Sequence, residues 1–293
     1  MLKKYNINVL GEVVMIAIEG LVKKFGERTA VDNLNLTIEQ GETFGLLGPN
    51  GAGKTTTIRI LTMLTRPTAG AVTINGWRLP HDEIAIKSVI GVVPQHFNLD
   101  SDLTARENLD LHGRLHHLPC GEREARREEL LEYVELRDRG NDMVNTFSGG
   151  MKRRLMIARA LLHKPKVLFL DEPTVGLDPQ VRRRLWDLIR HLNADGLTVL
   201  LTTHYIEEAQ NLCRRVAIME KGRLIALNSP TALCERLGNY VVEWAESEGT
   251  QYRFFSSRTD AAAFAGTLAV NATLRHTSLE DVFVELTGRR VSG

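Results

Sequence analysis

The sequence Gly48-Pro49-Asn50-Gly51-Ala52-Gly53-Lys54-Thr55-Thr56 fits the pattern G-x-x-x-x-G-K-[ST], which is typical of phosphate-binding loops. Glycines allow backbone amides to turn inward around an anion, and a helix that begins near Lys54 directs its positive dipole end at the phosphates. The Lys54 ammonium would lie against the β and γ phosphates, and the Thr55 hydroxyl can coordinate Mg²⁺. A strand-like apolar run at 42–47 precedes the loop and a helical pattern follows it, which favours this interpretation over a chance match in a glycine turn.

The segment Val167-Leu168-Phe169-Leu170-Asp171-Glu172-Pro173 is an apolar strand that ends in two acids. A buried strand that stops at Asp171 delivers a carboxylate to the carboxyl edge of the sheet, where α/β proteins bind ligands. Asp171 would hold Mg²⁺ directly or through water, and Glu172 would orient or deprotonate an attacking water. Strands that end in acids are also common at protein surfaces, so this segment alone leaves both interpretations open.

Length and composition limit the class of protein. At about 150 residues per domain, 293 residues correspond to two domains, or to one large domain with an appendage. With 43% hydrophobic and 25% charged residues, the chain is globular rather than disordered, collagenous or rod-like. The net charge of +1 disfavours a strongly basic nucleic-acid-binding protein. No apolar window approaches the roughly 18 residues of a membrane span, and the N-terminus lacks the apolar core of a secretory signal, so a cytoplasmic location is expected.

Alternating strand and helix patterns predict an α/β fold with a mostly parallel sheet. Short strands are expected at 14–20 and 34–38, around a turn at Phe25-Gly26-Glu27, and at 70–76, with a turn at Asn75-Gly76. Further strands are expected at 166–170, 197–202 and 215–219. Residues from about 97 to 160 contain Leu, Arg, Glu and His at helical spacing without a strand pattern, which predicts a helical insertion.

A second, smaller α+β domain is expected over 228–293, after a boundary at Asn228-Ser229-Pro230. Its predicted elements are strands at 239–245, 250–255 and 270–275, and a helix at 259–268. The last helix is expected to begin at Ser278, with Asp281 as its capping-box acid. Its apolar face would consist of residues at helical spacing, namely Leu279, Val282, Phe283 and Leu286.

Several other features are given ordinary structural interpretations. The three cysteines, Cys120, Cys213 and Cys234, are far apart and form no CxxC pair, which indicates reduced, partly buried thiols. His112, His116 and His117 could bind a metal, but a solvated helix face is favoured because no pattern of acidic ligands accompanies them. The basic runs 182–184 and 152–154 are interpreted as helix surface, although the second could also support phosphate or dimer contacts.

Further motifs appear in an order that resembles the ATPase subunit of ATP-binding cassette (ABC) transporters. The resemblance covers residues 15–227. Phe147-Ser148-Gly149-Gly150-Met151 resembles the signature loop, whose commonest form is LSGGQ. The other matching positions are Phe25 as the adenine-stacking aromatic residue, Gln95 in the Q-loop, Gly176-Leu177-Asp178-Pro179 as the D-loop, and His204 as the switch histidine.

The resemblance implies a P-loop NTPase core with an antiparallel β part near the N-terminus and a helical signature subdomain at about 97–160. ATP and Mg²⁺ are the implied cofactors. Residues implied to bind ATP are Phe25, the loop from Gly48 to Thr56, Ser148, Gly149, Gly150 and Asp178. Residues implied at the metal are Thr55, Gln95 and Asp171, and those implied in catalysis are Glu172, His204, Gln95 and Lys54.

The departures from the family pattern point to one branch of it. Met151 replaces the usual glutamine and Phe147 the usual leucine, yet SGGM followed by Lys-Arg-Arg-Leu is similar to the drug-resistance and Nod-factor exporters of the ABC-2 type. Phe25 stands where tyrosine is more usual, and it keeps the stacking face. Met15 resembles a more usual family start, so residues 1–14 are interpreted as an N-terminal extension.

One chain carries one phosphate-binding loop and one signature loop, and in the family these two meet across a head-to-tail dimer. The intact Glu172 and Ser148-Gly149-Gly150 favour a homodimer over a heterodimer. The resemblance therefore implies an ATP-hydrolysing subunit that works with a separate integral-membrane permease, on the cytoplasmic face of the membrane and without nucleic acid. An exporter is the preferred reading. The alternatives are the ATPase of an importer and a soluble cassette ATPase that acts on ribosomes or DNA.

Overall fold

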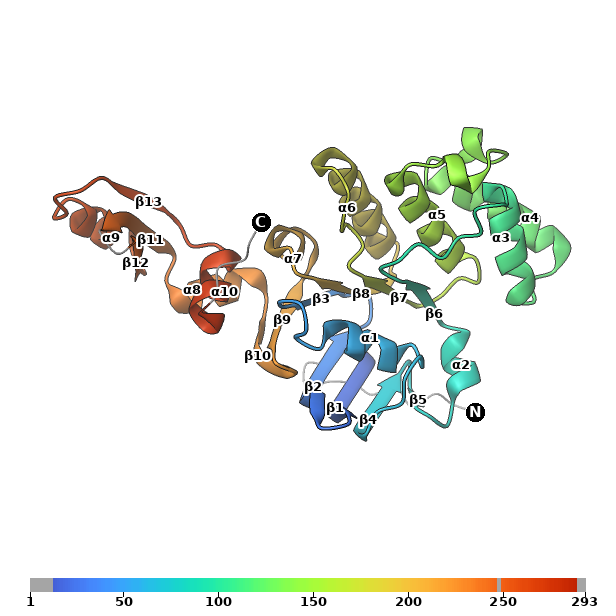
Figure 1. Ribbon diagram of the computed structural model, residues 1–293, viewed down its shortest axis with the longest axis horizontal. Coiled ribbons are helices and arrows are strands. Elements are labelled where there is room, and N and C mark those ends of the chain that lie inside the picture. The colour runs from blue at the N-terminus through green and yellow to red at the C-terminus, as the bar shows by residue number, and fades with distance from the viewer. Residues whose placement is uncertain (1–12, 247–248, 289–293) are drawn as a thin grey trace.

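A six-stranded sheet forms the centre of the fold (Figure 1). The computed structural model describes residues 13–246 and 249–288. The strand order is β10-β9-β3-β8-β7-β6, and every neighbouring pair is parallel except β10 with β9. The strands are β3 (Thr43–Leu47), β6 (Ile90–Val93), β7 (Val167–Asp171), β8 (Thr198–Thr203), β9 (Arg215–Glu220) and β10 (Arg223–Asn228). The predicted α/β fold with a mostly parallel sheet is confirmed.

A second, antiparallel sheet of order β2-β1-β4-β5 is built from the N-terminal part of the chain and lies below the six-stranded sheet in Figure 1. It consists of β1 (Val14–Phe25), β2 (Arg28–Glu39), β4 (Ala69–Ile74) and β5 (Trp77–Arg78). The prediction of short strands at 14–20 and 34–38 is wrong in length, because both strands continue to the turn at Gly26. Register shifts in β1 between Ile18 and Leu21 and again before Lys23 break the alternation of buried and exposed side chains, while the backbone pairing continues.

Helices cover both faces of the six-stranded sheet. The helices before β9 are α1 (Lys54–Leu61), α2 (Glu83–Lys87), α3 (Ala105–Leu115), α4 (Cys120–Tyr133), α5 (Gly149–Leu161), α6 (Pro179–Ala194) and α7 (Ile206–Leu212). In β7, Val167 and Phe169 face one core cluster with α1 and the antiparallel sheet, whereas Leu168 and Leu170 face another with α5 and α6. Because successive side chains of a strand point to opposite faces of the sheet, the core is divided into two layers.

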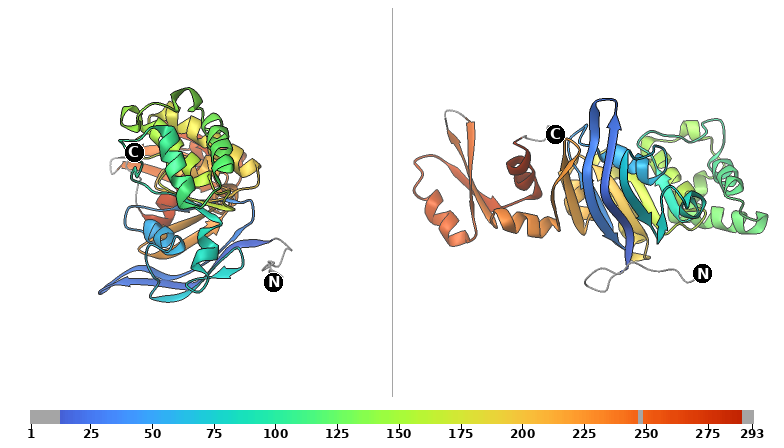
Figure 2. Two further views of the ribbon diagram at one scale, coloured as in Figure 1. Left: turned by 90° about the vertical axis from the view of Figure 1, so that its right-hand side faces the viewer. Right: turned by 90° about the horizontal axis from the view of Figure 1, so that it is seen from below.

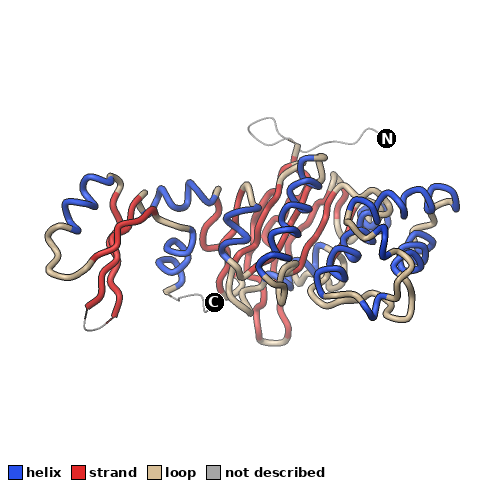
Figure 3. The backbone as a smooth tube through the Cα atoms, turned by 90° about the horizontal axis from the view of Figure 1, so that it is seen from above, coloured by secondary structure: helices blue, strands red, loops and turns tan. Residues whose placement is uncertain are grey.

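The predicted helical insertion lies between β6 and β7, at the end of the sheet that Figure 3 shows opposite the C-terminal strands. Over 97–160 the described pairing is a single bridge, Thr104 to Met143. The prediction of an exposed run at 152–154 is wrong for Arg153, which is 2% exposed. The helix turns this side chain toward the segment after β6, where its guanidinium binds backbone carbonyls.

A three-stranded antiparallel sheet of order β12-β11-β13 forms the C-terminal part, which extends away from the six-stranded sheet in Figure 2. Its elements are α8 (Pro230–Leu237), β11 (Tyr240–Glu246), β12 (Gly249–Phe255), α9 (Arg258–Ala265), β13 (Ala272–His276) and α10 (Leu279–Thr287). The expected capping box of Ser278 and Asp281 is present. Leu233 of α8 and Phe283 of α10 join the core cluster that contains residues of α7, so these two helices attach the C-terminal sheet to the rest of the fold.

Some predictions from periodicity need correction. Leu286 does not belong to the buried face of α10, because it is 41% exposed, whereas Leu279, Val282 and Phe283 are buried. It lies in the last turn of the helix, beyond the contact with α7 and α8. The sequence pattern also does not predict β6, β10 or α8, which are short or pair on one side only.

The remaining sequence features have the following positions. Most of the expected N-terminal extension, residues 1–12, lies outside the described residues. Cys120, Cys213 and Cys234 are free thiols, as expected. Within the described ranges, no helix combines the length and the apolarity that crossing a membrane requires.

Candidate functional site

The phosphate-binding loop lies between β3 and α1, at the carboxyl edge of the parallel strands (Figure 1). Close backbone contacts explain its glycines. A Cβ added at Gly48 would lie 2.4 Å from the Met219 carbonyl oxygen, and one at Gly53 would lie 2.5 Å from the Ala30 carbonyl oxygen. Gly53 also has a φ of 104° where α1 begins, in the left-handed region that favours glycine. The loop is therefore held as a tight turn before a helix N-terminus.

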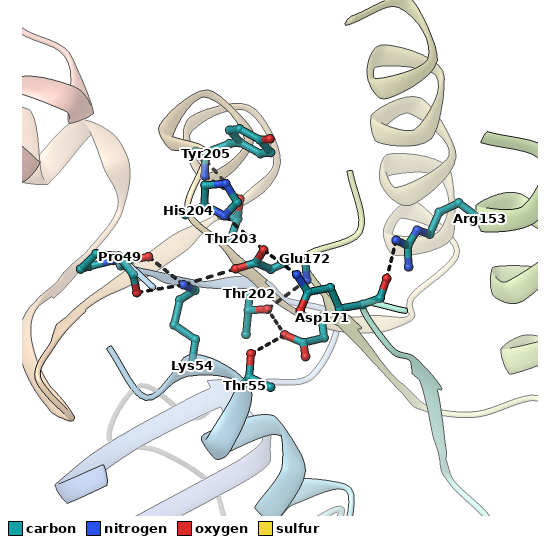
Figure 4. Close-up of polar contacts among 12 residues, drawn as sticks. Pro49, Lys54, Thr55, Arg153, Asp171, Glu172, Thr202, Thr203, His204 and Tyr205 are labelled. Atoms are coloured by element: carbon teal, nitrogen blue, oxygen red, sulfur yellow. Dashed lines mark hydrogen bonds and ion pairs between the residues drawn. The ribbon is translucent and has the colours of Figure 1, made fainter. Parts of the chain in front are cut away.

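Lys54 is buried inside this turn, with 3% exposure. Its Nζ donates hydrogen bonds to the carbonyl oxygens of Gly48 and Pro49, at 2.7 and 3.2 Å, and lies 3.4 Å from Glu172 Oε1 (Figure 4). Burial lowers the pKa of Lys54, while Glu172 and then Asp171 act to raise it. The ammonium is thus placed between the loop and the two carboxylates.

Asp171, the last residue of β7, is 6% exposed and is held by two hydroxyls. Thr55 Oγ1 donates to Asp171 Oδ1 at 3.2 Å, and Thr202 Oγ1 donates to the same oxygen at 2.6 Å (Figure 4). Thr202 lies opposite Asp171 in the register of β7 and β8. The hydroxyl of Thr55 and the carboxylate of Asp171 are hard oxygen donors at the phosphate-binding loop, a donor set that fits Mg²⁺.

The Glu172 carboxylate lies next to the other polar side chains of the site, those of Gln95 and His204. Its Oε2 accepts a hydrogen bond from Gln95 Nε2 at 3.3 Å, and lies 3.1 Å from His204 Nδ1 without a well-directed hydrogen bond. The backbone N–H of Glu172 donates to Thr202 Oγ1 and to the Thr202 carbonyl, at 3.0 and 3.1 Å. Its φ of 47° is a strained value for a residue with a side chain. Strain of this kind costs about 1–3 kcal/mol and persists where the surroundings over-determine it, commonly at functional sites.

Four strands place these groups at one edge. Lys54 and Thr55 follow β3, Gln95 follows β6, Asp171 ends β7, and His204 follows β8. The side chains of Lys54, Thr55, Asp171, Glu172 and His204 converge in Figure 4, and Gln95 donates to Glu172. A cavity of about 290 Å³ opens beside them. The cavity is lined by Arg28, Ala30, the residues from Asn50 to Thr56, Gln95 and Glu172. Residues far apart in the sequence thus meet at a single polar cavity.

The sequence motifs do not predict a role at the site for two residues of this region, Thr202 and Arg28. Thr202 precedes Thr203 and His204 at the end of a buried strand, and only the strand register shows that it faces Asp171. Arg28 is the cross-strand partner of Phe25 at the turn between β1 and β2. It lines the cavity, and its guanidinium would lie 3.6 Å from a Cβ at Gly51. Its place three residues after Phe25, the residue predicted to stack on adenine, is the signal that could have indicated it.

Other predicted residues lie apart from this cavity. Ser148 caps α5 by accepting a hydrogen bond from the Met151 amide, and a Cβ at Gly150 would lie 2.4 Å from Val181 Cγ1 on α6. The Ser148-Gly149-Gly150 loop therefore packs beside the segment of Asp178, which stands at the N-cap position of α6 without a capping hydrogen bond from its side chain. Neither segment lines the cavity. The ring of Phe25 is 52% exposed, with Lys23 Nζ 4.7 Å from its centroid.

A phosphate-binding loop between a parallel strand and a helix, with acids at the end of another parallel strand of the same sheet, defines a P-loop ATPase. Residues 31–175 match the family model described as ABC transporter. The linearmycin resistance ATP-binding protein LnrL of Bacillus subtilis is 45% identical over 224 residues, 76% of this chain and 72% of that protein. The Nod factor export ATP-binding protein I of Ralstonia nicotianae is 39% identical over 96% of both chains. The daunorubicin resistance ATP-binding protein DrrA3 of Streptomyces coeruleorubidus is 40% identical over 94% of this chain and 97% of that one.

Solved structures agree with these relatives. A dimeric post-hydrolysis state of the ATP-binding cassette MJ0796, bound to ADP and Pi, has a TM-score of 0.66 and 33% identity, over 73% of this chain and 98% of that chain. An ATP-binding subunit of an ABC transporter has a TM-score of 0.68 and 30% identity, over 76% and 92% of the two chains. The chain belongs to the ABC transporter family as an ATP-binding, ATP-hydrolysing subunit, and the resemblance to the drug-resistance and Nod-factor branch is confirmed.

Proposed function

We propose that two copies of this chain close on two ATP molecules and drive export through a separate integral-membrane permease, on the cytoplasmic face of the membrane. One observation carries the dimer. The cavity beside the phosphate-binding loop does not contain the Ser148-Gly149-Gly150 loop or Asp178, although these carry a hydroxyl, glycine amides and a helix N-terminus suited to an anion. A second copy supplies them in a head-to-tail arrangement.

The residues at the cavity divide the work of ATP hydrolysis. Lys54 holds the β and γ phosphates, and its burial strengthens this contact because little water screens the charge. Thr55 and Asp171 would hold Mg²⁺, with Gln95 as a further ligand, and the bound ion would neutralise phosphate charge. Phe25 presents an exposed ring to the adenine, and Arg28 carries a positive charge toward the phosphates from the neighbouring strand.

Glu172 is the residue proposed to activate water. Its carboxylate is 6% exposed, and its backbone is fixed by two hydrogen bonds to Thr202. Gln95 and His204 lie at its Oε2 atom, so they orient the carboxylate and can contact the γ phosphate on the same side. A carboxylate held in this way can accept a proton from water without reorganising, which is the condition for efficient general-base catalysis.

The accessory parts of the chain have proposed roles in this scheme. Residues 15–227 form the cassette and residues 228–293 an accessory unit, because α8 and α10 are the helices through which the C-terminal sheet contacts the cassette core. The near-zero net charge suits a subunit that docks on protein. The names of the curated relatives, which include Nod factor export and two antibiotic resistances, support export over import.

Substitution of Glu172 by Gln tests the proposal. This variant keeps the shape of the site but removes the proton acceptor, so hydrolysis by the purified full chain should fall by about 10²-fold or more. Nucleotide binding should persist, and light scattering should detect an ATP-dependent dimer. Glu124→Gln, at an exposed position of α4, is the matched control and should behave as the wild type. Normal hydrolysis by Glu172→Gln would contradict the assignment of the base, and a persistent monomer with ATP would contradict the dimer.

Co-purification with a membrane protein encoded beside this chain tests the permease.

A further inference from the structure

A positive charge is buried where α5 meets the segment that carries Gln95. Arg153 is 2% exposed, and Figure 4 shows its side chain reaching from α5 toward the site. Within residues 13–246 and 249–288, no carboxylate lies within the 4.0 Å ion-pair distance of its guanidinium. Asp171 and Glu208 act on this charge only from beyond that distance. A buried charge without a direct ion pair is unfavourable unless its hydrogen bonds replace those of water, so its partners indicate what it does.

The partners of Arg153 are backbone atoms of the segment after β6. One terminal nitrogen donates to the Pro94 carbonyl at 2.7 Å, and the other donates to the Gln95 carbonyl at 2.8 Å. The guanidinium also lies over the ring of Phe97, with 5.1 Å to its centroid. Because the backbone of Gln95 is held by Arg153, its side-chain amide remains available to donate to Glu172 Oε2 at 3.3 Å.

The same helix carries the Ser148-Gly149-Gly150 loop at its N-terminus. A Cβ added at Gly149 would lie 3.8 Å from Phe97 and 3.6 Å from Leu177, so the Gln95 segment and the segment before Asp178 both approach this loop. Farther along α5, Arg159 donates to the Asn98 carbonyl at 2.7 Å. Two arginines of one helix thus bind the segment 94–98 through its backbone.

We propose that Arg153 is a positioning residue that makes the Gln95 segment and the Ser148-Gly149-Gly150 loop move as one body, and that it thereby couples the two ATP sites of a dimer. This inference rests on the proposed function, since only a dimer brings the loop to a second ATP. Gln95 belongs to the site of the chain's own phosphate-binding loop, whereas the Ser148 loop serves the other site. A rigid connection between the Gln95 segment and the Ser148 loop makes a change of nucleotide at one ATP site alter the conformation of the other site.

Arg153→Met removes both hydrogen bonds and keeps a long apolar stem. Arg153→Lys keeps the charge but can reach one carbonyl at a time. Arg154→Met is the matched control, because Arg154 is the next residue of α5 and binds the Val134 carbonyl and Glu135, inside the helical insertion. Each full-length variant is titrated with a fluorescent ATP analogue, and its hydrolysis is measured over a range of ATP concentrations.

Arg153→Met should bind the analogue within about twofold of the wild type, while its maximal hydrolysis rate falls at least about fivefold, the lower end of coupling between two sites. Its Hill coefficient should fall toward one. Arg153→Lys should be intermediate, and Arg154→Met should keep the cooperativity of the wild type. A purely structural role would instead lower the melting temperature of Arg153→Met and leave the Hill coefficient of its folded fraction unchanged.

A double-mutant cycle with Gln95→Ala separates the possibilities. If Arg153 acts through Gln95, adding Arg153→Met to Gln95→Ala should change the rate little further. Additive losses, or a cooperative Arg153→Met variant, would overturn the inference and leave the proposed function intact. A wild-type chain that hydrolyses ATP without cooperativity and without dimers would instead overturn the proposed function, and the inference with it. Should Arg153→Met not fold, the same cycle is made with Arg153→Lys.

Discussion

Substitution of Thr202 by Val tests how Asp171 is oriented. Thr202 is fully buried, its hydroxyl donates to Asp171 Oδ1 at 2.6 Å, and it accepts from the Glu172 amide at 3.0 Å. Valine has the same shape without the hydroxyl. After the change, Asp171 keeps the weaker contact with Thr55 at 3.2 Å, and the Glu172 amide keeps the Thr202 carbonyl at 3.1 Å.

The lost hydrogen bond involves a charged acceptor and is worth about 1.5–3 kcal/mol. If the whole of this free energy acts on the orientation of Asp171, kcat/KM for ATP falls about 10- to 100-fold, since 1.4 kcal/mol corresponds to about a tenfold change. The Mg²⁺ concentration for half-maximal activity should rise as well. The assay is phosphate release by the purified full chain at varied free Mg²⁺, together with urea unfolding.

Thr198→Val is the control for a purely structural effect. Thr198 is a fully buried residue at the opposite end of β8, where its hydroxyl accepts a hydrogen bond from the Gly41 amide at 2.9 Å. Its removal should lower the free energy of unfolding by about 1–3 kcal/mol and leave the Mg²⁺ dependence unchanged. If Thr202→Val loses stability but hydrolyses ATP with wild-type kcat/KM and Mg²⁺ dependence, the hydroxyl does not orient Asp171.

Three further outcomes are expected. Lys54→Ala should lose nucleotide binding, and an unchanged affinity in isothermal titration would contradict its role. Arg28→Ala should weaken ATP binding about three- to tenfold at low salt and less at high salt, because the side chain is exposed; equal affinities at low salt would exclude a phosphate contact. Burial, with Arg159 and neighbouring imidazoles, lowers the pKa of His112 to about 4, and burial with His116 lowers that of His163 to about 4. Unfolded histidine titrates near 6.5, so the free energy of unfolding should fall between pH 6.5 and 4, and replacing both residues with Phe should flatten this dependence in urea titrations.

The local motifs could be read from the sequence because neighbouring residues along the chain carry them. Gly53 is followed directly by the helix that Lys54 begins, and Ser278 and Asp281 form their capping box within one turn. The buried strand that ends at Asp171 is a continuous apolar run, and it therefore predicts a parallel strand covered on both faces. These features depend on backbone conformation and short-range hydrogen bonds.

Long-range features could not be read in the same way, since register and packing bring their residues together. Thr202 faces Asp171 only because β7 and β8 pair in one particular register, and Arg28 faces the cavity because it pairs with Phe25 across a turn. The same basic run on α5 contains Arg153, which is buried, and Arg154, which binds the surface of the helical insertion. Charge alone does not distinguish two neighbouring positions on a helix.

The chain order of its motifs is thus enough to identify an ABC ATPase, because each motif is a local device for holding phosphate, metal or water. Only the folded structure shows which of these motifs lie together at one cavity and which lie apart from it. It gathers Lys54, Gln95, Glu172 and His204 at one sheet edge, and it leaves Ser148 beside the Asp178 segment and apart from that cavity. This difference depends on where strands end and how α5 and α6 pack, which are properties of the three-dimensional arrangement and not of any single segment.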